Sequence, residues 1–232
     1  MQFNSSAIIV AAGSSQRMQG LDKLWTPLAG RTTLARAIDV FESSPIIDDI
    51  ILVLNAERID NAKTLCQQEG WRKITGIVAG GILRQDSVLI GLDTLANIAP
   101  QTQWVMIHDG ARPLVTPEIL DAGLKAAQAC QAAIAGVPVK DTIKQAQQGW
   151  IYSTLDRSQL WAIQTPQVFS FPLIHHAYHH QMLQQEFTDD AALLEQLGQR
   201  VAIFPGSYRN IKITTQEDLL IAEALIKGLA AI

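Results

Sequence analysis

The chain has 232 residues, of which 18 are Lys or Arg and 22 are Asp or Glu, so its formal net charge is −4. At roughly 150 residues per domain, this length predicts one or two domains and a core that needs no disulfides. The acidic balance argues against a nucleic-acid binder, which would normally carry a basic face. Cys66 and Cys130 are too few for a disulfide framework or a four-ligand zinc site, and we expect both to be small core residues.

The amino-terminal residues lack the pattern of an exported or membrane-bound protein. Their longest apolar run, residues 7–12, is too short for the core of a signal peptide, and no Lys or Arg precedes it. No stretch approaches the roughly 18 consecutive apolar residues that a membrane span requires. We therefore expect a soluble, cytoplasmic protein with no membrane or nucleic-acid partner.

Short apolar runs alternate with longer amphipathic stretches along most of the chain. Because these runs are almost continuously apolar, they are typical of strands that helices cover on both faces, as in a parallel sheet. The runs that we predict to be strands are Ala7–Ala12, Ile50–Leu54, Ile74–Ala79, Trp104–His108 and Ala132–Val137.

Between these runs, apolar residues recur at helical spacing. Leu34, Ile38 and Phe41 fall on one helical face, and a second stripe runs through residues 119–127. Residues 87–95 and 215–227 show a similar pattern. The alternation predicts an α/β fold, with a doubly wound, mostly parallel sheet flanked by helices in a single domain over residues 1–232. Such sheets bind ligands beyond the carboxyl ends of their strands.

Residues 140–154 break this alternation, because their pattern is short, polar and β-like. Gln147, Gln148 and Gly149 can form the turn of a hairpin that leaves the sheet as an arm over about residues 139–160. A two-stranded ribbon is only marginally stable alone, and a second subunit is the simplest partner for it. We therefore expect a homodimer formed through this β-arm.

The first predicted strand leads into a loop that contains Gly13, Arg17 and Lys23. Backbone N–H groups in such a loop can bind an anion, and the two side chains add positive charge. The loop is not a P-loop, because its lysine is followed by leucine, and it is not a dinucleotide fingerprint, because Ser15 and Met18 replace glycines. It predicts another kind of phosphate site; the alternative is an ordinary turn with solvated cations.

Eight short motifs follow one another from this loop onward. They are A-A-G-x-x-x-R-M at 11–18 with a lysine at 23, G-G-x-x-R-x-x-S-V at 80–88, H-D-G-A-R-P at 108–113, V-K-D-T at 139–142, D-R at 156–157, Q-T-P-Q at 164–167, T-D-D-A at 188–191 and N-I-K at 210–212. Together they resemble the 2-C-methyl-D-erythritol 4-phosphate cytidylyltransferase family of the sugar-nucleotidyltransferase superfamily. The resemblance spans about residues 7–225.

The chain departs from the family pattern at several positions. Ser15 replaces a second glycine in the first loop, and no proline precedes Lys23. Ile82 and Leu83 replace acidic residues, which leaves the contacts to base or ribose at these positions open. Arg209 stands where an acidic residue is common. None of these changes removes a cation or the carboxylate expected to bind metal.

The resemblance implies that CTP and 2-C-methyl-D-erythritol 4-phosphate react to give a CDP-linked product and pyrophosphate, in non-mevalonate isoprenoid biosynthesis. A phosphate monoester is largely a dianion at neutral pH and needs no general base, so we expect catalysis by charge neutralisation and in-line alignment. Arg17 and Lys23 would hold the triphosphate, and Lys212 would lie near the substrate phosphate. Asp109 would bind Mg²⁺, or another divalent cation, that bridges the phosphates.

The resemblance also implies contacts to the nucleotide and to the sugar phosphate. Ser87 equally suits the N-cap of a helix. Thr142 and Arg157 flank the arm, and Arg157 would bind the sugar phosphate across the dimer interface. Arg112 and Thr165 are weaker substrate contacts, because the prolines that follow them suggest turns. The residues implied to contact the nucleotide are Ala11, Ala12, Gly13, Gly81, Ser87, Asp109 and Gly110.

Three other functions fit part of the pattern. A D-ribitol 5-phosphate cytidylyltransferase would share the nucleotide half and differ only in its acceptor pocket. A catalytically silent nucleotide-binding relative would not need all of the implied cations. A dinucleotide oxidoreductase is disfavoured by the failed glycine fingerprint.

Four histidines lie on a predicted helix in the pairs His175/His179 and His176/His180. A spacing of four residues can chelate a transition metal, but H-E-x-x-H is absent and no acidic or cysteine third ligand lies nearby in the sequence. We therefore interpret these histidines as solvated surface residues.

Overall fold

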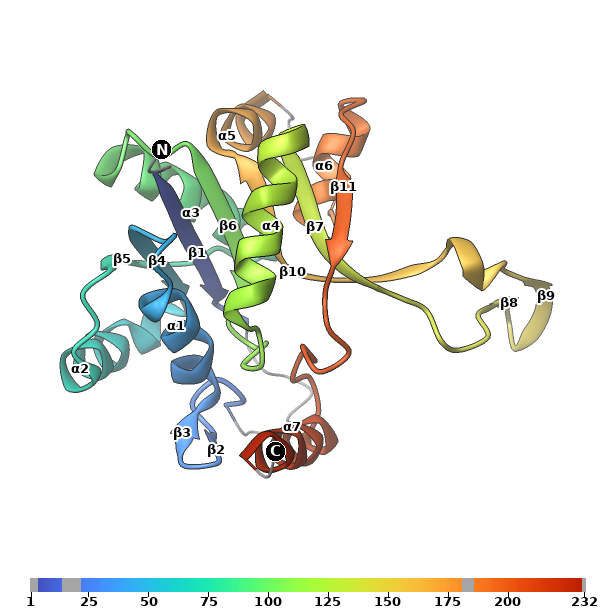
Figure 1. Ribbon diagram of the computed structural model, residues 1–232, viewed down its shortest axis with the longest axis horizontal. Helices are drawn as coiled ribbons and strands as arrows, with labels where there is room; N and C mark the ends of the chain where they lie inside the picture. Colours follow the sequence, from blue (N-terminus) through green and yellow to red (C-terminus); the bar gives the residue numbers. More distant parts are fainter. Residues whose placement is uncertain (1–3, 14–21, 181–185, 231–232) are drawn as a thin grey trace.

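The computed structural model describes residues 4–13, 22–180 and 186–230. Its centre is a seven-stranded sheet in the order β11-β7-β10-β6-β1-β4-β5 (Figure 1). All neighbours in the sheet are parallel except β10, which runs antiparallel to both β6 and β7. The strands are β1 Ser5–Ala11, β4 Asp49–Leu54, β5 Ile74–Ala79, β6 Trp104–Asp109, β7 Ala132–Pro138, β10 Trp161–Ser170 and β11 Ala202–Pro205.

Helices cover both faces of this sheet, as the sequence predicts. Successive strand side chains point to opposite faces, so Ile9 packs in the core beneath α1, α2 and α4, whereas Ile8 packs beneath α3, α5 and α6. Figure 1 shows these two layers. The helices are α1 Thr33–Ser43, α2 Ile59–Glu69, α3 Arg84–Ile98, α4 Pro117–Cys130, α5 Phe171–His180 and α6 Asp190–Gln196.

The predicted strands are confirmed, with ends that shift by no more than two residues. β5 differs from the expectation in its burial, because it forms the edge of the sheet and its residues are only partly covered. β10 and β11 were not among the predicted strands. β10 is the one that makes the sheet mixed.

The expectation for the cysteines is right for one and wrong for the other. Cys66 lies half-buried against the core, and burial raises the pKa of its thiol to about 11. Cys130 is exposed, because it is the last residue of α4 and lies where that helix reaches solvent. Its Sγ atom contacts the Ala126 carbonyl at 3.0 Å.

The predicted hairpin is present and extends away from the sheet (Figure 1). It consists of β8 Lys144–Gln147 and β9 Trp150–Thr154, which pair antiparallel. Gln148 and Gly149 connect them with φ angles of 50° and 84°, the left-handed conformation that two-residue hairpin turns require. The 3₁₀ helix η3, Arg157–Gln159, follows β9.

The carboxyl-terminal helix α7, Gln216–Ala230, lies against a small amino-terminal hairpin formed by β2 Pro27–Leu28 and β3 Arg31–Thr32. Leu28, Ile213 and Ala222 are buried together at this contact. One further 3₁₀ helix, η2 Ala56–Arg58, precedes α2. Among the helices in the described part of the chain, none has the length and apolarity of a membrane span.

Candidate active site

A cleft of about 170 Å³ opens at the carboxyl ends of β1 and β6 and at the loop after β5. Because these strands are parallel, their carboxyl ends meet at one edge of the sheet. The cleft is lined by Val10, Ala11, Ala12, Gly13, Lys23, Leu24, Gly81, Ile82, Leu83, Arg84, Ser87, Asp109, Ala111 and Lys212.

A second cavity of about 310 Å³ adjoins this cleft. Arg84, Asp109 and Lys212 line both spaces, so a carboxylate and two cations lie where the spaces meet. The other residues that line the second cavity are Arg112, Ile163, Gln164, Thr165, Gln167, Thr188 and Asp189.

Asp109 ends β6 with its side chain only 10% exposed. Lys212 Nζ lies 2.7 Å from one carboxylate oxygen, and Arg84 Nε lies 3.1 Å from the other. Burial alone would raise the pKa of this carboxyl, but Arg84 and Lys212 outweigh burial and hold the pKa well below its usual range. Asp109 is therefore ionised at neutral pH.

Arg84 is held in place by a second buried carboxylate. Its two terminal nitrogens donate to the Asp190 oxygens at 2.8 and 2.9 Å, a bidentate pair. Tyr178 donates its hydroxyl to the same carboxylate at 2.6 Å. Burial opposes the charge on Arg84, but Asp190 and Asp109 outweigh it and raise the pKa of the guanidinium. The arginine thus presents a fixed positive charge at the floor of the cleft.

His108, fully buried beside Asp109, is part of a hydrogen-bonded chain. Its Nε2 lies 3.1 Å from the Arg112 carbonyl, and its Nδ1 lies 3.1 Å from the Thr165 hydroxyl. Thr165 Oγ1 also accepts from the Asp109 amide at 3.0 Å. A neutral imidazole that donates from Nε2 and accepts at Nδ1 satisfies all three contacts. Burial lowers the pKa of His108 to about 4, so this neutral form is the one present near pH 7.

The loop after β5 packs tightly against the start of α3. α3 begins at Arg84, where the Asp86 carboxylate accepts from the Leu83 amide at 2.9 Å. Ser87 therefore lies one turn inside the helix, so of the two roles that the sequence left open for it, the N-cap is wrong. Its hydroxyl accepts from the Gly81 amide at 3.2 Å and lines the cleft instead.

Lys212 reaches the cleft because its segment is fixed on both sides. Asn210 donates from its side chain to the Thr165 carbonyl at 2.9 Å, and Arg112 donates to the Asn210 carbonyl at 2.8 Å. Ile213 donates from its amide to the Ala111 carbonyl at 2.8 Å. The N-I-K motif is thereby joined to the end of β6.

Most of the residues implied by the sequence are brought together. Arg112 and Thr165 line the second cavity, whereas Gly110 lines neither space and donates its amide to the Val10 carbonyl at 2.9 Å. Arg17 lies outside the described residues. Those that line the cleft are Ala11, Ala12, Gly13, Lys23, Gly81, Ser87, Asp109 and Lys212.

Thr142 and Arg157 are exposed on the arm, and neither lines the cleft or the second cavity of this chain. Arg157 donates to the Lys140 carbonyl at 2.9 Å. A single chain thus does not bring these two residues to Asp109.

The departures from the family pattern have different surroundings. Ile82 lines the mouth of the cleft and is 99% exposed, and Leu83 lies beside it at the N-cap of α3. Arg209 points to the carboxyl-terminal helix, where it donates to the Leu225 carbonyl at 3.3 Å. Arg209 therefore contacts α7, while Ile82 and Leu83 line the cleft.

Sequence reasoning gave no role to Arg84, Asp190 or Tyr178. Arg84 and Asp190 lie within two of the quoted motifs, which was the signal that could have found them. Tyr178 carries no such signal, because its partner Asp190 comes from the next helix.

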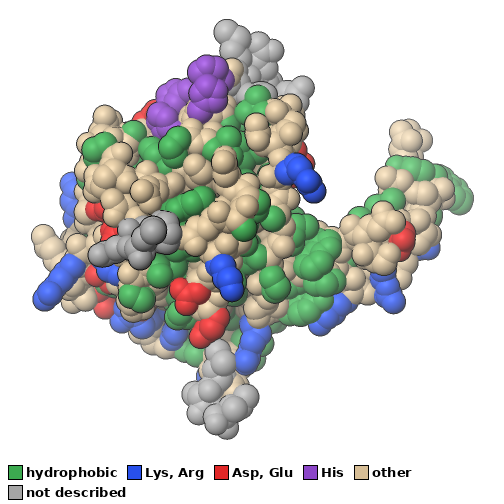
Figure 2. All heavy atoms as spheres, turned by 45° about the horizontal axis from the view of Figure 1, so that its top comes forward, with side chains coloured by type: hydrophobic (Ala, Val, Ile, Leu, Met, Phe, Trp, Pro, Cys, Tyr) green, Lys and Arg blue, Asp and Glu red, His purple; other side chains and the backbone are tan. Residues whose placement is uncertain are grey.

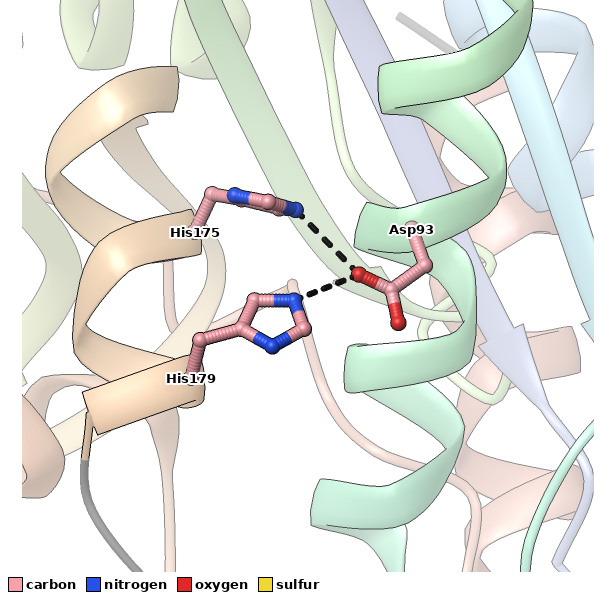
Figure 3. A group of neighbouring side chains, drawn as sticks. All are labelled: Asp93, His175 and His179. Atoms are coloured by element: carbon pink, nitrogen blue, oxygen red, sulfur yellow. Dashed lines mark hydrogen bonds and ion pairs between the residues drawn. The ribbon is translucent and has the colours of Figure 1, made fainter.

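His175 and His179 are partly exposed, and the structure adds an acidic neighbour that lies far from them in the sequence. Asp93 of α3 lies between His175 and His179, with its Oδ1 atom 3.2 and 2.7 Å from their Nε2 atoms (Figure 3). The sequence does not show this third group because it comes from a different helix on the same face of the sheet.

Comparison with known proteins identifies the family. The family model for 2-C-methyl-D-erythritol 4-phosphate cytidylyltransferase matches residues 5–228. The chain belongs to this family. A cytidylyltransferase of that name from Dehalococcoides mccartyi (strain CBDB1) is 49% identical over 222 residues, which cover 95% of each chain. Its counterpart from Syntrophotalea carbinolica is 49% identical over 227 residues and 94% of each chain.

Solved structures of this family share the fold. The crystal structure of 4-diphosphocytidyl-2C-methyl-D-erythritol synthase from Anaerococcus prevotii DSM 20548 matches with a TM-score of 0.84 and 32% identity. The match covers 98% of this chain and 100% of that one. The chain is thus a nucleotidyltransferase of this cytidylyltransferase family, and the alternatives that the sequence left open are not favoured.

Proposed function

We propose that this protein transfers the cytidylyl group of CTP to 2-C-methyl-D-erythritol 4-phosphate and releases pyrophosphate. One observation carries the proposal beyond family membership. The cleft and the second cavity meet at Arg84, Asp109 and Lys212, so a triphosphate in one and an acceptor phosphate in the other would meet beside fixed positive charge. The reaction is one step in the synthesis of isoprenoid precursors.

The acceptor phosphate is itself the nucleophile. Its oxygen attacks the α-phosphorus of CTP in line with the departing pyrophosphate, so the new P–O bond forms as the α–β bridge breaks. The phosphate is largely a dianion at pH 7, and no side chain needs to remove a proton. The barrier comes from repulsion between two anions, which Lys212 and Lys23 in the cleft would reduce. We assign the same role to Arg17.

Mg²⁺, or another divalent cation, would be held at Asp109. The donor set fits, because Mg²⁺ is bound by one or two carboxylates with phosphate oxygens and water completing the shell. Asp109 is ionised and lines both spaces, with Arg84 on one of its oxygens and Lys212 on the other. A carboxylate has about four lone-pair sites, so these two contacts do not exhaust its capacity to bind an ion. When bound, the ion would neutralise triphosphate charge and orient the α-phosphate.

The β-arm is proposed to join two subunits. It presents Trp150, Ile151 and Tyr152 with 81, 64 and 67% of their surfaces exposed, and Figure 2 shows apolar side chains along it. An exposed apolar ribbon of this kind is typical of a contact surface. Because Arg157 and Thr142 lie on the arm and away from their own cleft, we propose that they complete the acceptor pocket of the partner.

The reaction is tested by incubating the purified chain with CTP, Mg²⁺ and either 2-C-methyl-D-erythritol 4-phosphate or D-ribitol 5-phosphate. Release of pyrophosphate is followed in each case. We expect turnover with methylerythritol phosphate, loss of turnover in EDTA, and recovery on addition of Mg²⁺. Asp109→Asn should raise the Mg²⁺ concentration needed for half-maximal rate. Faster turnover with D-ribitol 5-phosphate would overturn the assigned acceptor.

The shared site is tested by mixing two inactive variants, Arg157→Ala and Lys212→Ala, after reversible subunit dissociation. If Arg157 serves the partner's cleft, half of the sites in each mixed dimer are intact, and about a quarter of wild-type activity returns. Each variant incubated alone provides the control. A mixture that stays inactive while mixed dimers are present would overturn the shared site.

A further inference from the structure

α3 and α5 bring three potential metal ligands together outside the cleft. His175 and His179 lie one turn apart on α5, and both direct Nε2 toward the same oxygen of Asp93 (Figure 3). The distances are 3.2 and 2.7 Å. All three ligand atoms lie within 4.8 Å of one another, and no other such group of three occurs among the residues that the structure describes.

The chemistry of this group matches a late transition-metal ion. Two imidazole nitrogens and one carboxylate oxygen form the type of three-residue ligand set that binds Zn²⁺ with an open fourth position. Ligand atoms bound at about 2.1 Å in a tetrahedron are separated by roughly 3.4 Å, so the two His–Asp separations of 3.2 and 2.7 Å would change by less than about 1 Å. Hard ions such as Mg²⁺ prefer oxygen ligands and would not select this set.

Asp93, His175 and His179 project from two helices that pack on a shared buried core, and solvent can reach all three side chains. α3 and α5 share one buried core, in which Leu92 lies next to Asp93, and Ile174 and Tyr178 lie on the inner face of α5. The Phe171 ring stacks on His175 with the ring centroids 5.3 Å apart. The three side chains are 31–45% exposed, so an ion can enter and water can complete its shell. Figure 2 shows the histidines together on the surface.

We propose that Asp93, His175 and His179 form a binding site for a divalent late transition metal such as Zn²⁺. The ion would link α5 to α3, because its ligands come from both helices. The site is separate from the candidate active site, because Asp93 lies nine residues after Arg84, roughly 13 Å further along α3. The proposal therefore stands independently of the proposed reaction.

A second histidine pair on α5 serves as a control for the proposed site. His176 and His180 have the same spacing as His175 and His179, and their rings stack with centroids 3.7 Å apart. Within the described residues, no acidic or thiol group joins them in a three-ligand cluster. A helix with two histidines at this spacing but no carboxylate should bind a metal more weakly than the three-ligand group.

The test is calorimetric titration of Zn²⁺ into the untagged, EDTA-treated chain. We expect one tight site, weakened at least tenfold by Asp93→Asn or His175→Gln/His179→Gln, since loss of an outer-shell partner alone costs about 10–100-fold. The control variant His176→Gln/His180→Gln should retain the tight site. Asp109→Asn should also retain it, which separates this ion from any ion in the cleft.

A second readout is thermal unfolding with and without Zn²⁺. The ion should raise the Tm of the wild type and of the control variant, but not that of His175→Gln/His179→Gln, whose metal-free Tm shows whether it folds. Equal loss of binding in both histidine variants would mean chelation by surface histidine pairs only. That result, or unchanged binding in Asp93→Asn, would overturn the proposed site.

Discussion

Asp109 is a buried carboxylate that remains ionised because Arg84 and Lys212 each contact one of its oxygens. Arg84 and Lys212 differ in how tightly the surrounding structure holds their side chains. Arg84 is fixed by the bidentate pair with Asp190, whereas the Lys212 side chain is 38% exposed and can contact a bound phosphate as well. His108, directly before Asp109, is fully buried, and burial lowers its pKa to about 4, so it is neutral near pH 7.

The exposure of Lys212 toward both cavities leads to a kinetic prediction. Lys212→Ala should lower kcat/KM for the sugar phosphate by roughly 100–1000-fold, the usual effect of removing one transition-state charge contact. CTP affinity should fall much less. Lys227→Ala on α7 is the matched control, because the Lys227 side chain is 72% exposed and its ammonium pairs with Glu223 of the same helix at 3.0 Å. Collapse of CTP affinity with intact acceptor affinity would contradict this division of roles.

The buried neutral His108 predicts a specific dependence of stability on pH. Its pKa is near 6.5 in the unfolded chain and about 4 in the folded one, so between these values the unfolded state binds more protons. Stability should fall as pH falls from about 6.5 to 4, by about 3 kcal/mol in total. Asp109, whose folded pKa lies below its ordinary value, loses its contribution only at lower pH.

Urea unfolding at pH 7 and pH 4.5 measures this effect. His108→Gln can keep one donor and one acceptor but cannot take up a proton in this range. Its stability should therefore change less than that of the wild type between the two pH values. Equal pH slopes for the two proteins would show that His108 does not titrate as described.

The end of β1, the loop after β5 and the first turn of α3 pack closely together where the nucleotide is expected to bind. The loop after β5 passes between the end of β1 and the first turn of α3, and Gly80 is packed against both. A Cβ atom added there would lie 2.5 Å from the Ala12 Cβ and 2.6 Å from the Ser87 hydroxyl. The small residue is thus required by packing of three elements and not by a turn.

Gly80→Ala should push the β1 loop away from α3. We expect a loss of about 1–3 kcal/mol in the free energy of unfolding, as for other overpacked sites, and a higher KM for CTP. Gly228→Ala on α7 is the control, because its added Cβ comes no closer than 3.9 Å to a neighbouring atom and alanine favours a helix. Chemical denaturation and initial rates measure both effects; a Gly80→Ala protein with wild-type stability and KM would contradict the packing argument.

Over the whole molecule, the two ends of the chain cooperate to complete the cleft. The amino-terminal half supplies β1, its loop and Lys23, and the carboxyl-terminal segment supplies Lys212. α7 follows Lys212 and docks on Leu28, with Ala222 fully buried at the contact. The position of Lys212 therefore depends on a contact far from the sheet that carries Asp109.

Ala222→Asp tests this dependence. A carboxylate buried at the contact should lower the free energy of unfolding by at least about 3 kcal/mol and should release α7. Activity should fall even in the folded fraction, because Lys212 loses its support. Leu220→Asp, at a position 70% exposed on the same helix, should change stability by no more than about 0.5 kcal/mol.

Thermal unfolding followed by circular dichroism, together with kcat/KM at a temperature where each variant is folded, separates the two effects. A fully folded Ala222→Asp protein with wild-type kcat/KM would show that α7 does not position Lys212.

The sequence by itself determined five of the seven strands of the central sheet, several of the helices between them and the edge of the sheet where the motifs gather. These features follow from local patterns, because apolar runs and helical spacing act over a few residues. The parallel order then places Gly13, Gly81 and Asp109 together, since their strands end at one edge. The turn at Gln148 and Gly149 could also be predicted, because turn-forming residues act locally.

Only the tertiary structure decided which distant side chains meet. The antiparallel insertion of β10 between β6 and β7 brings Thr165 to His108, and no local pattern specifies that neighbour. Likewise, Asp190 pairs with Arg84, and Asp93 lies between two histidines, because helices far apart in sequence pack on one face of the sheet. Charge pairs of this kind depend on how elements cross in space, which spacing along the chain does not encode.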